Sequence, residues 1–68
     1  MAVGEERRAA LLGAIRMLPV DLREVVTCRY LLELSEAETA AALDIPAGTV
    51  KSRLRRALAR LRGELPDV

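Results

Sequence analysis

The segment from Gly48 to Arg62, GTVKSRLRRALARLR, limits the possible folds of this chain more than any other stretch. Its apolar residues recur every three or four positions, so at about 100° per residue they fall on one side of a helix. With Val50 set at 0°, that side lies between about 340° and about 80° and carries Ala57, Leu61, Leu54, Leu65 and Leu58. Such a helix needs other helices to cover its apolar side. The chain has no Phe or Trp and one Tyr, so the predicted core is aliphatic and helical.

A first helix is predicted over residues 5–18. Leu11, Ile15 and Leu18 follow one another at helical spacing, which places them on one face. Acidic residues stand in the first turn, where the helix dipole favours them. Pro19 then ends the helix, because its ring cannot continue the hydrogen-bonding pattern.

A second helix is predicted to begin at Asp21 and to end near Leu34. The Asp21 carboxylate is expected to cap the first turn, with Glu24 reaching back as in a capping box. The apolar residues are spread widely around this helix, which favours a mostly buried position; they are Leu22, Val25, Val26, Tyr30 and Leu31 or Leu32.

A third, Ala-rich helix is predicted to run to about Leu43. Ser35 and Glu38 have the spacing of a second capping box at its start. The chain then breaks at Asp44, which tolerates the left-handed conformation of a tight turn, and Pro46 is well suited to begin the next helix.

The last two helices have the spacing of a helix-turn-helix, over residues 36–64. This motif needs a small residue where the helices cross, a permissive turn residue and an apolar contact on the second helix. The residues predicted to meet these needs are Ala40, Asp44, Val50 and Leu54. Asp44 replaces the commoner Gly, so we expect a slightly strained turn. The last helix is predicted over 47–64, ended by Pro66, which makes the fold class an all-α, four-helix domain with a C-terminal helix-turn-helix and no sheet.

The outer side of the last helix is small and basic. Gly48, Ser52 and Ala59 form a ridge between about 160° and about 200°, with Arg55 and Arg56 beside it. Small side chains allow close approach to a DNA major groove, and Arg can form a bidentate pair with guanine. The basic side chains that flank the ridge are expected to contact mainly DNA phosphates; they are Lys51, Arg53, Arg60 and Arg62.

Charge is unevenly distributed along the chain. Residues 1–50 hold five basic and eight acidic groups, a net of −3, whereas residues 51–68 hold six basic and two acidic groups, a net of +4. An acidic block next to the last helix could discourage misplaced DNA or simply solvate the surface; it consists of Glu33, Glu36, Glu38 and Asp44. Charge alone leaves a solvated face, a membrane-surface helix and a partner-binding helix as alternatives.

Several function classes lack the residues that they need. The chain has no His and a single cysteine, Cys28, so we expect no disulfide, no metal site, no catalytic residues and no cofactor. Cys28 is predicted to be a small buried residue. No apolar run reaches the length of a membrane span and the start lacks a signal-peptide pattern, which predicts a cytoplasmic protein with no membrane or small-molecule partner.

The stretch LPVDLREVVTCRYLLELSEAETAAALDIPAGTVKSRLRRALARLR closely resembles region 4 of the bacterial sigma-70 superfamily, specifically the extracytoplasmic function (ECF) sigma factors. The elements LP, LREV, LSEAE and IPAGTVKSRLRRA occur in the family's order and spacing. The resemblance covers residues 5–65 and implies the sigma4 architecture, a winged-helix-like class without a sheet. Residues 1–4 and 66–68 are then expected to be flexible ends. Since the family's other main domain is missing, we expect the chain to be a fragment of a longer protein.

The resemblance implies recognition of the −35 promoter element as part of RNA polymerase holoenzyme. It implies three partners: double-stranded promoter DNA, the β-subunit flap of the core enzyme and an anti-sigma factor. The family's base-contacting positions carry over to Lys51, Ser52, Arg53, Arg55 and Arg56. Gly48 and Thr49 correspond to backbone contacts at the helix start, where amides and the Thr49 hydroxyl can hold a phosphate.

Two alternatives remain open from the residues. A LuxR-type response-regulator output domain shares the four-helix architecture and a TVK at the recognition helix, but usually continues with a His-containing stretch. A protein-interaction module would instead use the basic helix to dock on an acidic partner. The continuation SRLRRALARLR favours the sigma-factor interpretation.

Overall fold

The computed structural model describes residues 2–64, which are helical apart from short connections and contain no strand. The elements in chain order are α1 (Ala2–Arg16), α2 (Val20–Val26), the π-helical turn η1 (Thr27–Leu31), α3 (Glu36–Leu43) and α4 (Ala47–Glu64). This confirms the all-α prediction for this part of the chain. Leu65 and Pro66, predicted to extend the apolar side and to end the last helix, lie outside the described residues.

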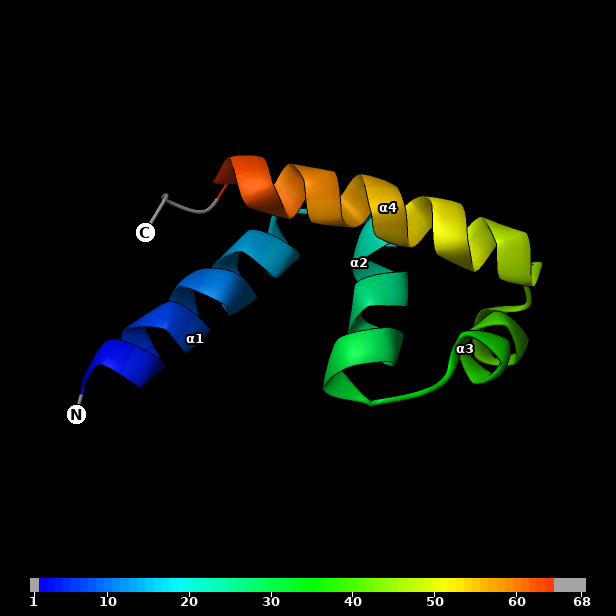
Figure 1. The fold of residues 1–68 in the computed structure, drawn as a ribbon, viewed down its shortest axis with the longest axis horizontal. Coiled ribbons are helices and arrows are strands. Elements are labelled where there is room, and N and C mark those ends of the chain that lie inside the picture. Colours follow the sequence, from blue (N-terminus) through cyan, green and yellow to red (C-terminus); the bar gives the residue numbers. More distant parts are fainter. Residues whose placement is uncertain (1, 65–68) are drawn as a thin grey trace.

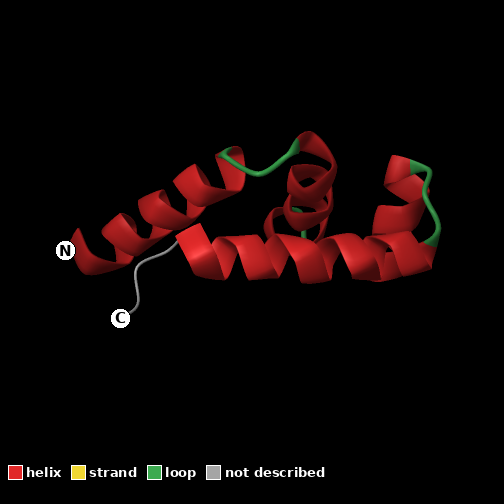
Figure 2. Cartoon of the chain, turned by 90° about the horizontal axis from the view of Figure 1, so that it is seen from above, coloured by secondary structure: helices red, strands yellow, loops and turns green. Residues whose placement is uncertain are grey.

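The long helix α4 organises the domain. It runs along the longest axis, with α1 near its C-terminal end, α2 against its middle and α3 beside its start (Figures 1 and 2). The second view shows the three shorter helices on the same side of α4, which leaves its opposite side uncovered. One side of α4 therefore packs in the core, and its opposite side is an uncovered outer surface.

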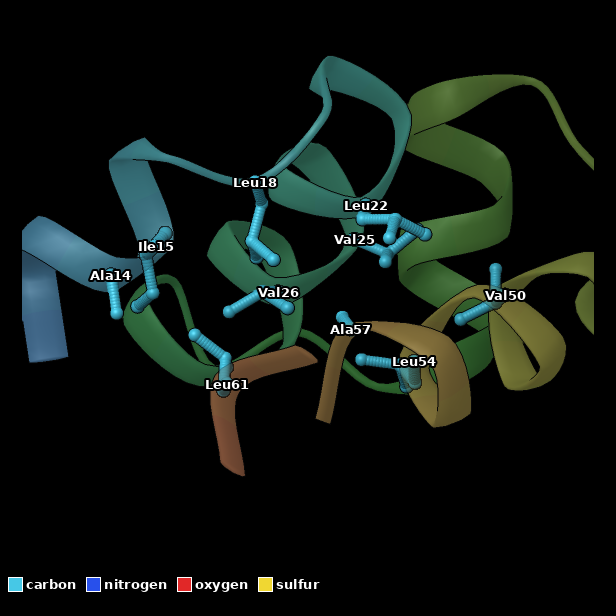
Figure 3. Close-up of a cluster of buried hydrophobic side chains, with 10 residues drawn as sticks. All are labelled: Ala14, Ile15, Leu18, Leu22, Val25, Val26, Val50, Leu54, Ala57 and Leu61. Atoms are coloured by element: carbon cyan, nitrogen blue, oxygen red, sulfur yellow. The ribbon is translucent and has the colours of Figure 1, made fainter. Parts of the chain in front are cut away.

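The core is aliphatic and is built from α1, α2, α4 and the turn after α1 (Figure 3). Its members are Ala14, Ile15, Leu18, Leu22, Val25, Val26, Val50, Leu54, Ala57 and Leu61. The apolar side predicted for the last helix is thus confirmed at four positions of α4, and Leu58 packs against the same cluster while partly exposed. Cys28 is buried, as predicted.

The first helix begins earlier than predicted. α1 starts at Ala2 rather than near Glu5, since no helix-breaking proline precedes Glu5. Ile15 and Leu18 are buried as expected, but Leu11 remains 39% exposed. Leu11 precedes the part of α1 that supplies the core, and its side chain lines an apolar groove instead.

The predicted capping box at Asp21 and Glu24 is wrong. α2 begins at Val20, with Pro19 as its N-cap and no side-chain capping hydrogen bond; the Arg23 amide donates to the Pro19 carbonyl at 2.9 Å. The extended ψ of 151° at Pro19 already provides the change of direction into the helix. Asp21 consequently lies inside the first turn, two residues beyond the N-cap, and its Oδ1 accepts only from the Leu22 amide, at 2.9 Å.

The second predicted helix is neither continuous nor buried to its end. Beyond Val26 the backbone widens into η1, where the Leu32 amide donates to the Thr27 carbonyl at 2.9 Å. The wider turn breaks the 100° periodicity on which the prediction of burial relied. Three of its apolar side chains are consequently about half exposed: Tyr30, Leu31 and Leu32. Glu33, with φ of 57°, then turns the chain toward α3.

The predicted start of α3 is confirmed. The Ser35 hydroxyl accepts from the Glu38 amide at 3.0 Å, and the Glu38 carboxylate accepts from the Ser35 amide at 2.7 Å. Arg29 braces the preceding connection from η1, since its guanidinium donates to the Leu34 carbonyl. Together these contacts fix the direction in which α3 leaves the core.

Candidate nucleic-acid interface

The turn between α3 and α4 sets the crossing of the two helices. Asp44 adopts the left-handed conformation, with φ of 57° and ψ of 49°, and the Ile45 amide donates to the Ala40 carbonyl at 3.0 Å. Val50 is fully buried and Leu54 nearly so, while Ala40 is partly buried against the same core. The turn and these packed side chains hold α4 with its polar side outward.

The ridge of small residues lies on this outward side. Gly48, Ser52 and Ala59 are all exposed. A Cβ placed at Gly48 would meet no atom within 4 Å, so the domain's own packing does not require a glycine there. The Ser52 hydroxyl donates to the Thr49 carbonyl at 3.2 Å, which leaves its lone pairs free to accept.

The start of α4 offers fewer free amides than the sequence suggests. The amides of Thr49 and Val50 both donate to the Pro46 carbonyl, at 3.0 and 3.2 Å. A phosphate at this end of α4 would therefore have to use the amides of Ala47 and Gly48 or the Thr49 hydroxyl.

Five of the six basic side chains of α4 are exposed to solvent: Lys51, Arg55, Arg56, Arg60 and Arg62. Arg53 differs, because only 26% of its side chain is exposed. Its Nε lies 4.0 Å from Asp21 Oδ2, on the side of α4 that faces α2. On the opposite flank Lys51 Nζ lies 4.0 Å from Glu36 Oε1, so one member of the predicted acidic block touches the basic helix.

Within residues 2–64, two of the grooves that border α4 are well defined. An open groove of about 540 Å³ separates it from the start of α2 and is lined by Pro19, Asp21, Leu22, Arg56, Ala59 and Arg60. A second, apolar groove of about 320 Å³ lies between α1, η1 and the far half of α4; its lining consists of Leu11, Ile15, Val26, Tyr30, Leu58 and Leu61. The first groove carries two arginines and one carboxylate, whereas the second is apolar and suits an apolar side chain.

The structure brings together residues that the sequence did not connect. The pairing of Asp21 with Arg53 escaped prediction because the residues are far apart in the chain and Asp21 was assigned a local capping role. The apolar groove was missed because Tyr30 was expected in the core.

Within residues 2–64, no three His, Cys, Asp or Glu side chains lie close enough to hold a metal ion. None of the described helices is long and apolar enough to span a membrane.

Similarity to known proteins agrees with this geometry. Residues 8–61 match the family described as Sigma-70, region 4. The RNA polymerase sigma-E factor of Streptomyces antibioticus is 55% identical over 58 residues, covering 85% of this chain and 32% of the relative. That of Streptomyces coelicolor is 53% identical over 58 residues, covering 85% and 33%. The ECF RNA polymerase sigma-E factor of Escherichia coli K12 is 46% identical over 57 residues, covering 84% and 30%.

The chain therefore spans about a third of the length of these relatives. The family match nevertheless extends from α1 to the last buried leucine of α4, Leu61, and includes the whole turn between α3 and α4. By that match the chain belongs to the sigma-70 region 4 family.

Proposed function

We propose that this domain binds the −35 promoter element, with α4 in the major groove, as part of a bacterial sigma factor that directs RNA polymerase in transcription initiation in the cytoplasm. The observation that carries the proposal is the division of α4. Its apolar side anchors the core, while its free side presents small residues flanked by exposed arginines. A major groove admits a helix of this kind.

Within this proposal, base contacts come from the residues on and beside the ridge: Lys51, Ser52, Arg55 and Arg56. The resemblance also carries Arg53 over as a base-contacting position, but its side chain lies on the flank that faces Asp21 of α2, so we assign Arg53 to a phosphate contact. The DNA backbone is held by Gly48, Thr49, Arg60 and Arg62. The open space around Gly48 supports close approach of DNA at the start of α4. The match to region 4 favours this assignment over the LuxR-type alternative.

Titration of short duplexes tests the proposal. A duplex enriched by the domain from a random pool should bind more tightly than its scrambled counterpart at both about 50 and about 200 mM salt, although both affinities fall as salt rises. Binding with no sequence preference that disappears with modest salt would instead indicate a general polyanion-binding surface.

We further propose that the apolar groove receives the β-subunit flap of RNA polymerase, and that an anti-sigma factor competes for the domain. The support is that the groove has an apolar lining and that two of its residues, Leu11 and Tyr30, are exposed to solvent. Tyr30→Asp puts a charge in the apolar groove, so it should weaken binding of a purified β-flap fragment by about tenfold or more and leave duplex binding unchanged. Leu32→Asp is the matched control, since Leu32 is 61% exposed and does not line the groove. Equal losses in both variants would refute the groove as the docking site.

A further inference from the structure

Arg53 differs from the other basic residues of α4 because it is paired with an acidic residue, Asp21. Its side chain is 26% exposed, and its Nε lies 4.0 Å from Asp21 Oδ2. On the helical wheel Arg53 stands near 300°, away from the ridge and on the same flank as Arg56 and Arg60. The least exposed basic side chain of α4, Arg53, therefore already faces a carboxylate of the domain itself, that of Asp21.

Asp21 is held in this position by its own helix. Its Oδ1 accepts a hydrogen bond from the Leu22 amide at 2.9 Å, which leaves Oδ2 directed toward Arg53. Asp21 also borders the open groove that Arg56 and Arg60 line. One carboxylate thus stands among three arginines on the flank of α4 where the groove wall of a docked duplex would lie.

We propose that Asp21 is a built-in competitor of the DNA phosphate for Arg53, which lowers the affinity of the domain for DNA of every sequence. This inference rests on the proposed function. Carboxylate and phosphate oxygens both accept charge-assisted hydrogen bonds from a guanidinium. The attraction between Arg53 and a DNA phosphate is therefore weaker while Arg53 is paired with Asp21. Base contacts on the ridge are unaffected, and the total affinity then depends more on them.

The size of the effect follows from the exposure of the pair. Asp21 and Arg53 are 47% and 26% exposed, so water screens their attraction and DNA can displace Asp21 at modest cost. Removal of the carboxylate should therefore tighten DNA binding by about two- to fivefold. The salt dependence should steepen by about one phosphate contact, since Arg53 becomes free to release a counterion.

The test is a double-mutant cycle in the 68-residue chain, with Asp21→Asn, Arg53→Gln and the double variant. Dissociation constants are measured on the enriched duplex and on its scrambled form over a range of salt. Asp21→Asn should tighten binding to both duplexes alike, and the gain should vanish when Arg53 is Gln. Glu24→Gln is the matched control, because Glu24 is an exposed acid of α2 that belongs to neither the Asp21–Arg53 nor the Glu36–Lys51 pair.

An equal gain from Asp21→Asn in the Arg53→Gln background, or an equal gain from Glu24→Gln, would overturn the inference in favour of a general charge effect. Circular dichroism checks that each variant folds; Asp21→Ser replaces Asp21→Asn if the latter does not. The coupling is measurable on scrambled DNA as well. Failure of sequence preference would thus refute the proposed function without obscuring the result for Asp21.

Discussion

Arg56 and Arg62 are both exposed on α4, yet they lie differently with respect to the ridge. Arg56 stands beside Ser52 and Ala59 and lines the open groove toward α2. Arg62 lies six residues nearer the C-terminal end of α4, beyond the part of the helix that carries Gly48 and Ser52. The two residues therefore provide a direct contrast between base and phosphate contacts.

Arg56→Ala should cost about 1–3 kcal/mol of binding free energy on the enriched duplex and relax the preference at one base pair, because a bidentate pair with guanine is lost. Affinities for a set of single-base-pair variants of the duplex measure this. The same loss on every duplex would assign Arg56 to the phosphate contacts.

Arg62→Ala should weaken binding to all sequences alike and reduce the slope of log affinity against log salt by about one. The measurement is a salt titration of the enriched and scrambled duplexes. An unchanged slope would place Arg62 outside the contact surface.

Thr39 is fully buried, and its hydroxyl oxygen has no hydrogen-bond partner. Thr39→Val keeps the shape of the side chain and removes the unsatisfied polar group, so it should raise the free energy of unfolding by about 1–2 kcal/mol. Urea unfolding measures the change. Thr39→Ser, which keeps the hydroxyl and removes a methyl group, should lower stability; a stabilising effect of Ser would contradict this account.

At the scale of elements, the helix-turn-helix depends on one residue with unusual backbone geometry. Asp44 holds the left-handed conformation at the end of α3, and the crossing of α3 and α4 follows from it. An L-residue with a Cβ is disfavoured in this region, although Asp is better tolerated than most. The turn is therefore mildly strained, as expected from the presence of Asp44 where Gly is commoner.

Substitutions at Asp44 should rank in stability by their tolerance of positive φ. Asp44→Gly is expected to exceed Asp44→Ala by about 1–2 kcal/mol in free energy of unfolding, since Gly has no Cβ penalty there. Thermal unfolding of both variants provides the comparison, and Asp44→Asn controls for the lost charge. If Ala proved as stable as Gly, the turn would not be strained at this residue.

The predictions from sequence succeeded where the signal lies in neighbouring residues. The Ser35 capping box, the break before Pro46 and the apolar side of α4 each need only a few consecutive positions, and all three are present. Predictions failed where geometry depends on distant parts of the chain. The widening at η1 exposes Tyr30, and the contact of Asp21 with Arg53 exists only once α2 has packed on α4.

At the scale of the whole molecule, binding and folding share one helix. α4 supplies Val50, Leu54, Ala57 and Leu61 to the core and also carries the proposed DNA surface. A ligand that binds only the folded domain must stabilise the core as well. The buried thiol of Cys28, in η1 and away from the outer side of α4, can report this coupling.

Duplex at about 100 times its dissociation constant should stabilise the domain by about 2.7 kcal/mol and slow the labelling of Cys28 by about a hundredfold, because the thiol reacts only when the domain opens. Reaction with a thiol-specific reagent, with and without the enriched duplex, measures the rates. Equal rates would mean that DNA binding does not require the packed core.

The two sides of α4 have no residue in common, and this separation affects how the domain can diverge over generations. Changes on the ridge of Gly48, Ser52 and Ala59 alter a solvent-exposed surface and leave the packed side chains intact. Under the proposed function, a duplicated gene can thus acquire a new DNA-sequence preference through a few substitutions without passing through an unfolded intermediate. Diversity of target sites is consequently an evolutionarily accessible outcome for a domain built on a helix of this kind.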